Sequence, residues 1–214
     1  MRLFDETQRE GGVKASALTI APAPFVTVKA FVVKHHYSHS VNGVKARYCF
    51  QVGYEGALVG AVLFGAMSTT AWRRFSDSEE KVLELRRLVL LDEAERNSES
   101  RVIGWCLRWI RKHLPTIEVV VSYADPARGH TGGIYRASNF EYLGVTAPDV
   151  GLRDVQSGKT YHSRALRTRD SHGFYKPFVV KLRLAAEAGA LEKIPLPGKH
   201  CFIYRLRETV QGGR

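Results

Sequence analysis

The spacing of hydrophobic and polar positions predicts alternating strands and helices along most of the chain. Two strand-like apolar runs meet at residues 55–56, a Glu-Gly pair, and form the strongest β-hairpin pattern in the sequence. Farther along, Val102, Cys106 and Ile110 recur four residues apart, which predicts an amphipathic helix that ends before Pro115. The remaining predicted elements are a strand entering a helix over 25–38, strands over 83–92, 117–126 and 140–146, a short helix over 132–139, and a helix, a Pro-Gly turn and a final strand over 178–206.

This order of elements favours an α+β fold, with a mixed and mostly antiparallel sheet flanked by helices. Residues 1–24 end in Ala-Pro-Ala-Pro, which interrupts regular structure, so we expect them to form an N-terminal arm. Residues 25–214 are then expected to be a single domain that includes a basic insertion over 150–185. A chain of 214 residues is long enough to bury a core without disulfide bonds.

The composition is that of a globular protein with an excess of positive charge. Hydrophobic residues make up 44% of the chain, and the apolar runs are too short to cross a bilayer. The N-terminus lacks the apolar core of a signal peptide, so we expect a cytoplasmic protein. A net charge of +11 favours a polyanionic partner such as nucleic acid. The sequence does not indicate an oligomeric state, and its isolated cysteines predict buried thiols.

Residues 150–185 combine many basic side chains with aromatic ones, a mixture that suits phosphates and unstacked bases. A solvated basic loop is the alternative. A second basic and aromatic segment lies near residue 73. The predicted DNA contacts are Arg73, Arg74, Arg164, Arg167, Arg169 and Lys176.

Three histidines, a tyrosine and two serines occupy residues 35–40. If this segment is helical, His35 and His39 share one face at a spacing typical of paired metal ligands, although a third ligand would have to come from a distant segment. Alternatively, His36, Tyr37 and Ser38 line a substrate pocket. The third interpretation is a polar helix end without a chemical role, and the segment is therefore not assigned as a metal site.

The hairpin, the following strand Glu-Leu-Arg-Arg-Leu-Val-Leu over 84–90, and the later strands resemble the GNAT-type N-acyltransferase superfamily over roughly residues 25–147. The resemblance implies that an acyl-CoA donor lies along this strand and that amides at the next helix hold its pyrophosphate. The usual glycine-rich loop is replaced by residues 95–104, which also make an ordinary helix N-cap. The implied donor-binding residues are Arg86, Arg87, Leu88, Arg96, Asn97, Ser98, Ser100 and Asn139.

Five motifs in order resemble the Mom DNA-modification proteins of Mu-like bacteriophages, over about residues 29–206. They are HHYSHS, ELRRLVL, RNSESRVIG, YADPARGHTGGIYRASNFEYLG and LPGKHCFIYRL. The resemblance implies a transferase that converts adenine in DNA to N6-carbamoylmethyladenine and thereby protects phage DNA from host restriction. Iron has been associated with the family. The alternatives are a conventional N-acetyltransferase acting on a protein or small amine, and a DNA-binding protein without catalytic activity.

Adenine modification requires an extruded base and groups that manage the proton of its amine. Asp125 and His130 follow a strand end, where side chains reach into a cleft, and Asp125 is the first choice as base or hydrogen-bond acceptor. Tyr135 is the expected general acid by resemblance to GNAT enzymes. Plain alternatives are a turn-forming role for Asp125 and a core role for Tyr135. The predicted catalytic residues are His36, Tyr37, Ser38, Asp125 and Tyr135.

The sequence leaves two candidates for the donor of the two-carbon group. Acetyl-CoA supplies two carbons but lacks the terminal nitrogen of the product, whereas a glycyl group from charged tRNA would place every atom on the adenine amine. The net charge of +11 and the altered phosphate loop favour the second donor. The expected partners are therefore DNA and, with this donor, tRNA.

Overall fold

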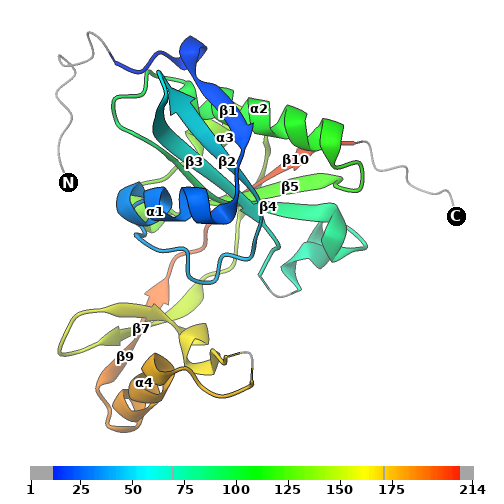
Figure 1. The fold of residues 1–214 in the computed structure, drawn as a ribbon. Helices are drawn as coiled ribbons and strands as arrows, with labels where there is room; N and C mark the ends of the chain where they lie inside the picture. Colours follow the sequence, from blue (N-terminus) through cyan, green and yellow to red (C-terminus); the bar gives the residue numbers. More distant parts are fainter. Residues whose placement is uncertain (1–11, 69, 171, 208–214) are drawn as a thin grey trace, which may run out of the picture. The chain divides into compact units, whose positions relative to one another are not determined.

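The computed structural model describes residues 12–68, 70–170 and 172–207, and these residues form two compact units (Figure 1). Unit one contains the chain up to Ala124, then Thr131–Gly144, and the chain from Cys201 onward. Unit two contains Asp125–His130 and Val145–His200. The basic segment 150–185 therefore lies entirely in unit two.

A seven-stranded sheet, in the order β1-β2-β3-β4-β5-β10-β6, forms the centre of unit one. Strands β1 to β4 pair in antiparallel fashion, whereas β4 and β5 are parallel, so the sheet is mixed and mostly antiparallel as predicted. The strands are β1 Thr19–Pro22, β2 Ala46–Tyr54, β3 Ala57–Gly65, β4 Val82–Leu90, β5 Val119–Ala124, β6 Glu141–Val145 and β10 His200–Arg205.

The predicted hairpin is confirmed as β2 and β3, which pair from Ala46 to Gly65. Its turn residues Glu55 and Gly56 both have positive φ, 48° and 80°. Two consecutive residues with positive φ are typical of the tight turns that match the twist of antiparallel strands, and glycine adopts this conformation without steric cost.

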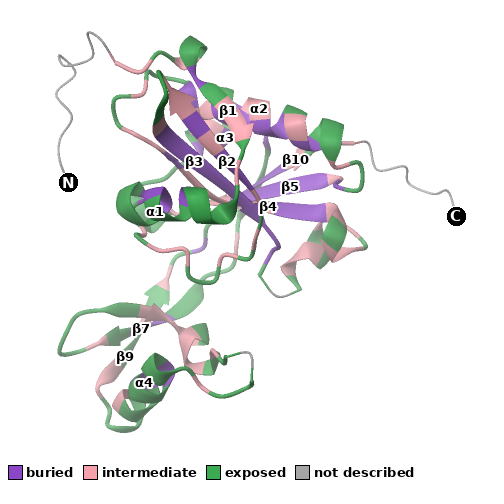
Figure 2. Cartoon of the chain, viewed as in Figure 1, coloured by how far each residue is buried: buried purple, intermediate pink, exposed green. Residues whose placement is uncertain are grey.

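Helices cover both faces of the sheet. Val102 and other residues of α2 (Ser98–His113) pack with Val62 and Phe64, whereas Val28 and Val32 of α1 (Phe25–His35) pack with the alternate residues of β3. Because successive strand residues point to opposite faces, the two helices lie on opposite sides. Figure 2 shows the buried residues concentrated along β2 to β5.

The prediction of a strand entering a helix over 25–38 was wrong. This segment is α1 from its start, and the first strand lies earlier, at Thr19–Pro22 inside the predicted arm, where it pairs with β2. Val28, Phe31 and Val32 have the spacing of one helix face and are buried together, so helical packing decides the conformation of a β-branched segment. Part of the predicted arm, residues 1–11, lies outside the described residues.

The helix predicted before Pro115 is confirmed as α2, with buried residues along one face. Asn97 is its N-cap residue in a left-handed conformation, φ 71°, and its side chain makes no capping hydrogen bond. The short predicted helix is α3, Gly133–Arg136.

Unit two contains a three-stranded antiparallel sheet in the order β8-β7-β9 together with one helix. Its elements are β7 Asp149–Asp154, β8 Thr160–His162, α4 Pro177–Glu187 and β9 Leu191–Leu196. The sequence predicted the helix but none of these three strands; in β9 the adjacent charges of Glu192 and Lys193 and the proline at 195 weaken the strand pattern. Within residues 12–207, apart from the two undescribed positions, no helix has the length and apolar character needed to span a membrane.

Candidate active site

Strands β4 and β5 pair only at their beginnings. The register joins Val82–Glu84 to Val119–Val121, while β4 continues to Leu90 and β5 to Ala124. A β-bulge in β4 shifts the pairing with β3 so that Leu63 faces Arg87 and Phe64 faces Leu85. Bulges often re-aim side chains beside active sites. The pairing of β4 with β5 ends at Glu84 and Val121, which leaves a gap between these two strands, and the polar residues Glu84, Arg86 and Ser122 lie at or just beyond that point.

Glu84 and Arg86 form an ion pair at the start of this gap. The Arg86 Nη1 atom lies 2.7 Å from Glu84 Oε2, and the two side chains, of Arg86 and Glu84, are 12% and 14% exposed. Arg86 also donates to the Ser68 hydroxyl and to the Gly43 carbonyl, at 3.2 Å and 3.0 Å. Removing either partner of a pair this buried would leave an uncompensated charge.

Arg87 anchors the loop that follows α1. Its Nε donates to the Ser40 carbonyl at 3.2 Å, and its Nη1 donates to the Arg86 carbonyl at 2.7 Å. Burial lowers the pKa of Arg87, and neighbouring Tyr37 opposes that shift. Together the two arginines of β4 hold the histidine-rich loop against the sheet, which is a positioning role.

The loop itself places His36 in the interior. His36 is the C-cap residue of α1 and is 6% exposed. The Ser38 amide donates to His36 Nδ1 at 3.1 Å, so that nitrogen carries a lone pair and the proton of a neutral ring resides on Nε2. The His36 and Tyr37 rings lie 4.2 Å apart between centroids. The three predicted residues His36, Tyr37 and Ser38 are therefore brought together.

Tyr135 of α3 is 8% exposed. Burial raises the pKa of Tyr135, and the negative charge of nearby Glu84 raises it further. The Ser122 hydroxyl of β5 opposes this shift; it is close to the phenol but does not reach hydrogen-bond geometry, since Ser122 Oγ makes no hydrogen bond within the described chain. Tyr135 is thus a neutral phenol at physiological pH.

Glu84 was not predicted as a site residue. Besides its effect on Tyr135, its charge raises the pKa of Tyr123, for which burial is the larger cause. A signal for Glu84 does exist in the sequence, because it stands between the buried residues Leu83 and Leu85 of a strand and shares a face with Arg86. An acid inside such a strand requires a partner.

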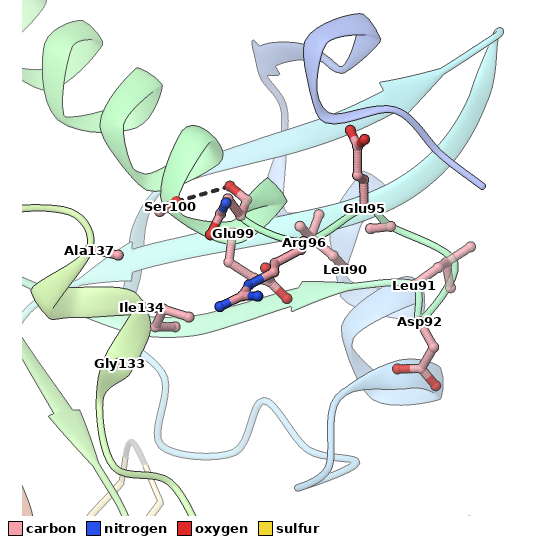
Figure 3. Close-up of a pocket in the computed structure, with 12 residues that line it drawn as sticks. Leu90, Leu91, Asp92, Glu95, Arg96, Glu99, Ser100, Gly133, Ile134 and Ala137 are labelled. Atoms are coloured by element: carbon pink, nitrogen blue, oxygen red, sulfur yellow. Dashed lines mark hydrogen bonds between the residues drawn. The ribbon is translucent and has the colours of Figure 1, made fainter. Parts of the chain in front are cut away.

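A pocket of about 730 Å³ lies where β4 ends and α2 begins (Figure 3). In Figure 3 the side chain of Arg96 extends toward Ile134 of α3. Three carboxylates, on Asp92, Glu95 and Glu99, share the lining with this single arginine. The lining therefore carries more acidic than basic side chains, although the Glu95 carboxylate accepts a hydrogen bond from the Ala15 amide at 2.8 Å. The full lining is Leu90, Leu91, Asp92, Ala94, Glu95, Arg96, Asn97, Glu99, Ser100, Gly133, Ile134 and Ala137.

The structure does not bring all the predicted donor-binding residues together: some line this pocket and the others lie elsewhere. Arg96, Asn97 and Ser100 line the pocket, and Ser100 uses its hydroxyl to donate to the Asn97 carbonyl at 2.9 Å. Ser98 is fully buried and is not part of the lining. Asn139 is exposed beyond α3, with φ 61°. Arg86, Arg87 and Leu88 lie on β4, where both arginines are occupied by the contacts described above.

Asp125 and His130 belong to unit two. The Asp125 carboxylate accepts from the Ala127 amide at 3.1 Å and lies 3.5 Å from Lys199 Nζ. The first contact is that of a turn-forming aspartate. A catalytic role for Asp125 stays a prediction, and these contacts account for the residue without one.

The predicted DNA-contacting arginines are exposed. Arg73 and Arg74 belong to a short 3₁₀ helix of unit one, Ala71–Arg74, and their guanidinium groups lie over the rings of neighbouring aromatic residues. Arg164, Arg167, Arg169 and Lys176 are in unit two. Arg164 contacts both nitrogens of His162, whereas Lys176 precedes α4 as its N-cap residue.

The metal geometry considered for the histidines does not fit. α1 ends at His35, so His35 and His39 are not on one helix face, and His39 has φ 44° with its Nδ1 within 3.1 Å of the Val33 carbonyl. Over the described residues no group of three His, Cys, Asp or Glu side chains could hold a metal ion. The described residues therefore do not provide an iron site.

Comparison with known proteins gives both a family and a fold. The model of the Mom protein family matches residues 17–213. Methylcarbamoylase mom of Escherichia phage Mu is 40% identical over 124 residues, which are 55% of this chain and 50% of that protein. The chain thus spans about half the length of this curated relative.

Among solved structures, a putative acetyltransferase from Salmonella typhimurium, YncA, in complex with acetyl-CoA has a TM-score of 0.52 and 10% identity, over 92% of this chain and 98% of that one. The ribosomal-protein-S18-alanine N-acetyltransferase of Escherichia coli has a TM-score of 0.49 and 8% identity, over 92% and 99%. At such identities the likeness shows the fold alone, and the predicted GNAT-like α+β fold is confirmed. Because the family model covers most of the chain, this protein belongs to the Mom protein family.

Proposed function

We propose that this protein is a transferase that modifies the exocyclic amine of adenine in DNA, with N6-carbamoylmethyladenine as its product. The observation that carries this proposal is the family match over residues 17–213, together with a relative named methylcarbamoylase. The polar residues at the gap between β4 and β5 support a catalytic role for unit one.

The adenine amine is a weak nucleophile, because its lone pair is delocalised into the ring. A transferase must therefore remove a proton from the amine as the new bond forms and protonate the departing group. Tyr135 is our candidate for the protonation of the departing group, because its phenol is neutral and lies near Glu84 and Ser122. Two carboxylates are candidates for the removal of the amine proton, namely Glu84 in the gap of unit one and the predicted Asp125.

We propose a glycyl ester as donor in preference to acetyl-CoA. Attack of the adenine amine on the ester carbonyl forms a glycyl amide and releases the alcohol, and one amine proton moves to the leaving oxygen. The glycyl amine then attacks purine C6 and the original C6–N6 bond breaks, so that N6 becomes the terminal amide. This isomerisation needs no further reactant. The acidic pocket, with three carboxylates and one arginine, favours a donor bearing an ammonium group over one bearing a pyrophosphate.

Mass spectrometry of nucleosides from cells that express the protein tests the proposed reaction. We expect an adenosine that carries an added carbamoylmethyl group, and a level of it lower by roughly 10²–10⁴-fold in the same cells expressing Tyr135→Phe in equal amount. Reactions with purified protein then compare acetyl-CoA with glycyl-tRNA as the only two-carbon source. Modification with acetyl-CoA alone would contradict the glycyl donor. Unmodified DNA in the presence of abundant protein would contradict the function itself.

A further inference from the structure

Tyr175 in unit two is enclosed by two arginines. The guanidinium carbon of Arg169 lies 4.3 Å from the centre of the tyrosine ring, and that of Arg183 lies 4.7 Å from it. Both guanidiniums also donate to the Tyr175 hydroxyl, at 3.2 Å and 3.3 Å. The ring thus fixes two cations in place, which lowers the entropy that they would lose on binding a phosphate.

The preceding residue, Phe174, is 71% exposed although its backbone is firmly held. Asp170 and Phe174 pair through their backbones at 2.8 Å, and the Asp170 carboxylate accepts from the Phe174 amide at 3.0 Å. Arg169 donates to the carbonyl of Gly173, whose φ is 84°, at 2.6 Å. These hydrogen bonds fix the backbone of the turn that presents the Phe174 ring to solvent.

The segment of the chain around Phe174 is strongly basic. Residues 159–183 contain seven lysines and arginines and a single acid, Asp170, whose carboxylate is engaged within its own turn. Such a patch complements the closely spaced phosphates of duplex DNA.

We propose that Phe174 is a wedge that inserts into the base stack of duplex DNA, while Arg169 and Arg183 contact the adjoining phosphates. This inference rests on the proposed function, because an adenine that is modified on its amine must leave the stack, and a side chain that fills the vacated space lowers the cost of extrusion. Phenylalanine is among the residues that proteins insert between base steps.

The wedge is tested by measuring the affinity of the protein for two DNA duplexes. One duplex is fully paired, and the other has the same sequence but a single central abasic site. This comparison does not require catalysis. We expect the wild-type chain to prefer the abasic duplex by about tenfold or more, because part of the stack is already open. Phe174→Ala should abolish this preference with little effect on the affinity for the paired duplex. Phe174→Leu should retain most of the preference, since leucine also serves as an apolar wedge. Val155→Ala is the matched control, because Val155 is also apolar, exposed at 64% and in unit two.

Two outcomes would overturn the wedge. One is wild-type binding without a preference for the abasic duplex, and the other is a preference that survives in Phe174→Ala. Vesicles of phosphatidylserine and phosphatidylcholine provide the comparison with an anionic membrane, and a Phe174-dependent affinity for vesicles but not for DNA would also overturn the proposal. None of these measurements depends on adenine modification. The wedge can therefore be confirmed or rejected even if the proposed reaction is wrong.

Discussion

Glu84 and Arg86, two residues apart on β4, face each other at 2.7 Å with side chains that are 14% and 12% exposed. We expect Glu84→Gln to lower the free energy of unfolding by about 3 kcal/mol, because it leaves the Arg86 charge buried without compensation. Glu84→Gln combined with Arg86→Gln should cost less than the sum of the two single changes. Urea unfolding of the four proteins measures this coupling, and additive effects would contradict an energetic pairing.

The proposed proton-donating role of Tyr135 can be tested separately from folding. Tyr135→Phe removes only the hydroxyl, so we expect adenine modification to fall by roughly 10²–10⁴-fold, the usual contribution of a general acid. The affinity for DNA and the unfolding transition should stay close to those of the wild type. Tyr123→Phe is the matched control on β5. Equal losses of modification in the two variants would argue against a specific proton donor.

Stability at alkaline pH follows from the raised pKa of Tyr135, for which burial is the main cause. In the unfolded chain a tyrosine titrates near pH 10, whereas in the folded protein it stays protonated to a higher pH. Its stabilising contribution is therefore fully present below about pH 10 and is lost as the pH rises through the folded-state value. Urea unfolding between about pH 9 and pH 11 should show a steeper fall in stability for the wild type than for Tyr135→Phe.

The acidic residues of the pocket are expected to lower the affinity for acetyl-CoA. Glu99 lies in the first turn of α2, where a carboxylate repels a pyrophosphate that would otherwise be favoured by the helix terminus. We expect Glu99→Gln to raise the affinity for acetyl-CoA about two- to fivefold, the size of a typical helix-dipole interaction. Glu93→Gln is the control, because Glu93 lies in the same loop but outside the lining. Calorimetric titration measures both, and strong binding by the wild type would contradict the account of the pocket.

Gly132 supports Tyr135 from the start of α3. Its φ is 78°, and a Cβ at this position would lie 2.2 Å from the Phe202 ring. Gly132→Ala should therefore destabilise the protein by more than the strain of a positive φ alone, about 1 kcal/mol. Gly129→Ala isolates that strain, because Gly129 has φ 74° but open space around its Cα. Thermal unfolding of both variants compares the two costs.

Much of unit one could be predicted from the sequence, because periodicity, the Glu55-Gly56 turn and Pro115 are local signals. α1 was misassigned at its start because Val26, Val28 and Val32 favour strands locally, and only packing against β3 makes the segment helical. Glu84 was not predicted, although its place between buried residues of a strand marks it as an acid that requires a partner. Its position beside β5 could not be predicted locally, because it depends on pairing between strands more than thirty residues apart.

In unit two the sequence predicted the basic and aromatic composition but not its arrangement. Arg169 and Arg183 both stack on Tyr175, and this contact joins a turn to a helix. Local sequence patterns do not predict a contact of this kind. The division at Ala124 was likewise not foreseen, although it assigns Asp125 and Tyr135 to different units.

In the large sheet the last strand, β6, lies next to β10. The chain leaves unit one after β6 and returns at β10, and these strands are neighbours at the end of the sheet. An interruption between adjacent strands removes no rung from the ladder of backbone hydrogen bonds. The part of unit two that lies between β6 and β10 can therefore change in length without interrupting the large sheet.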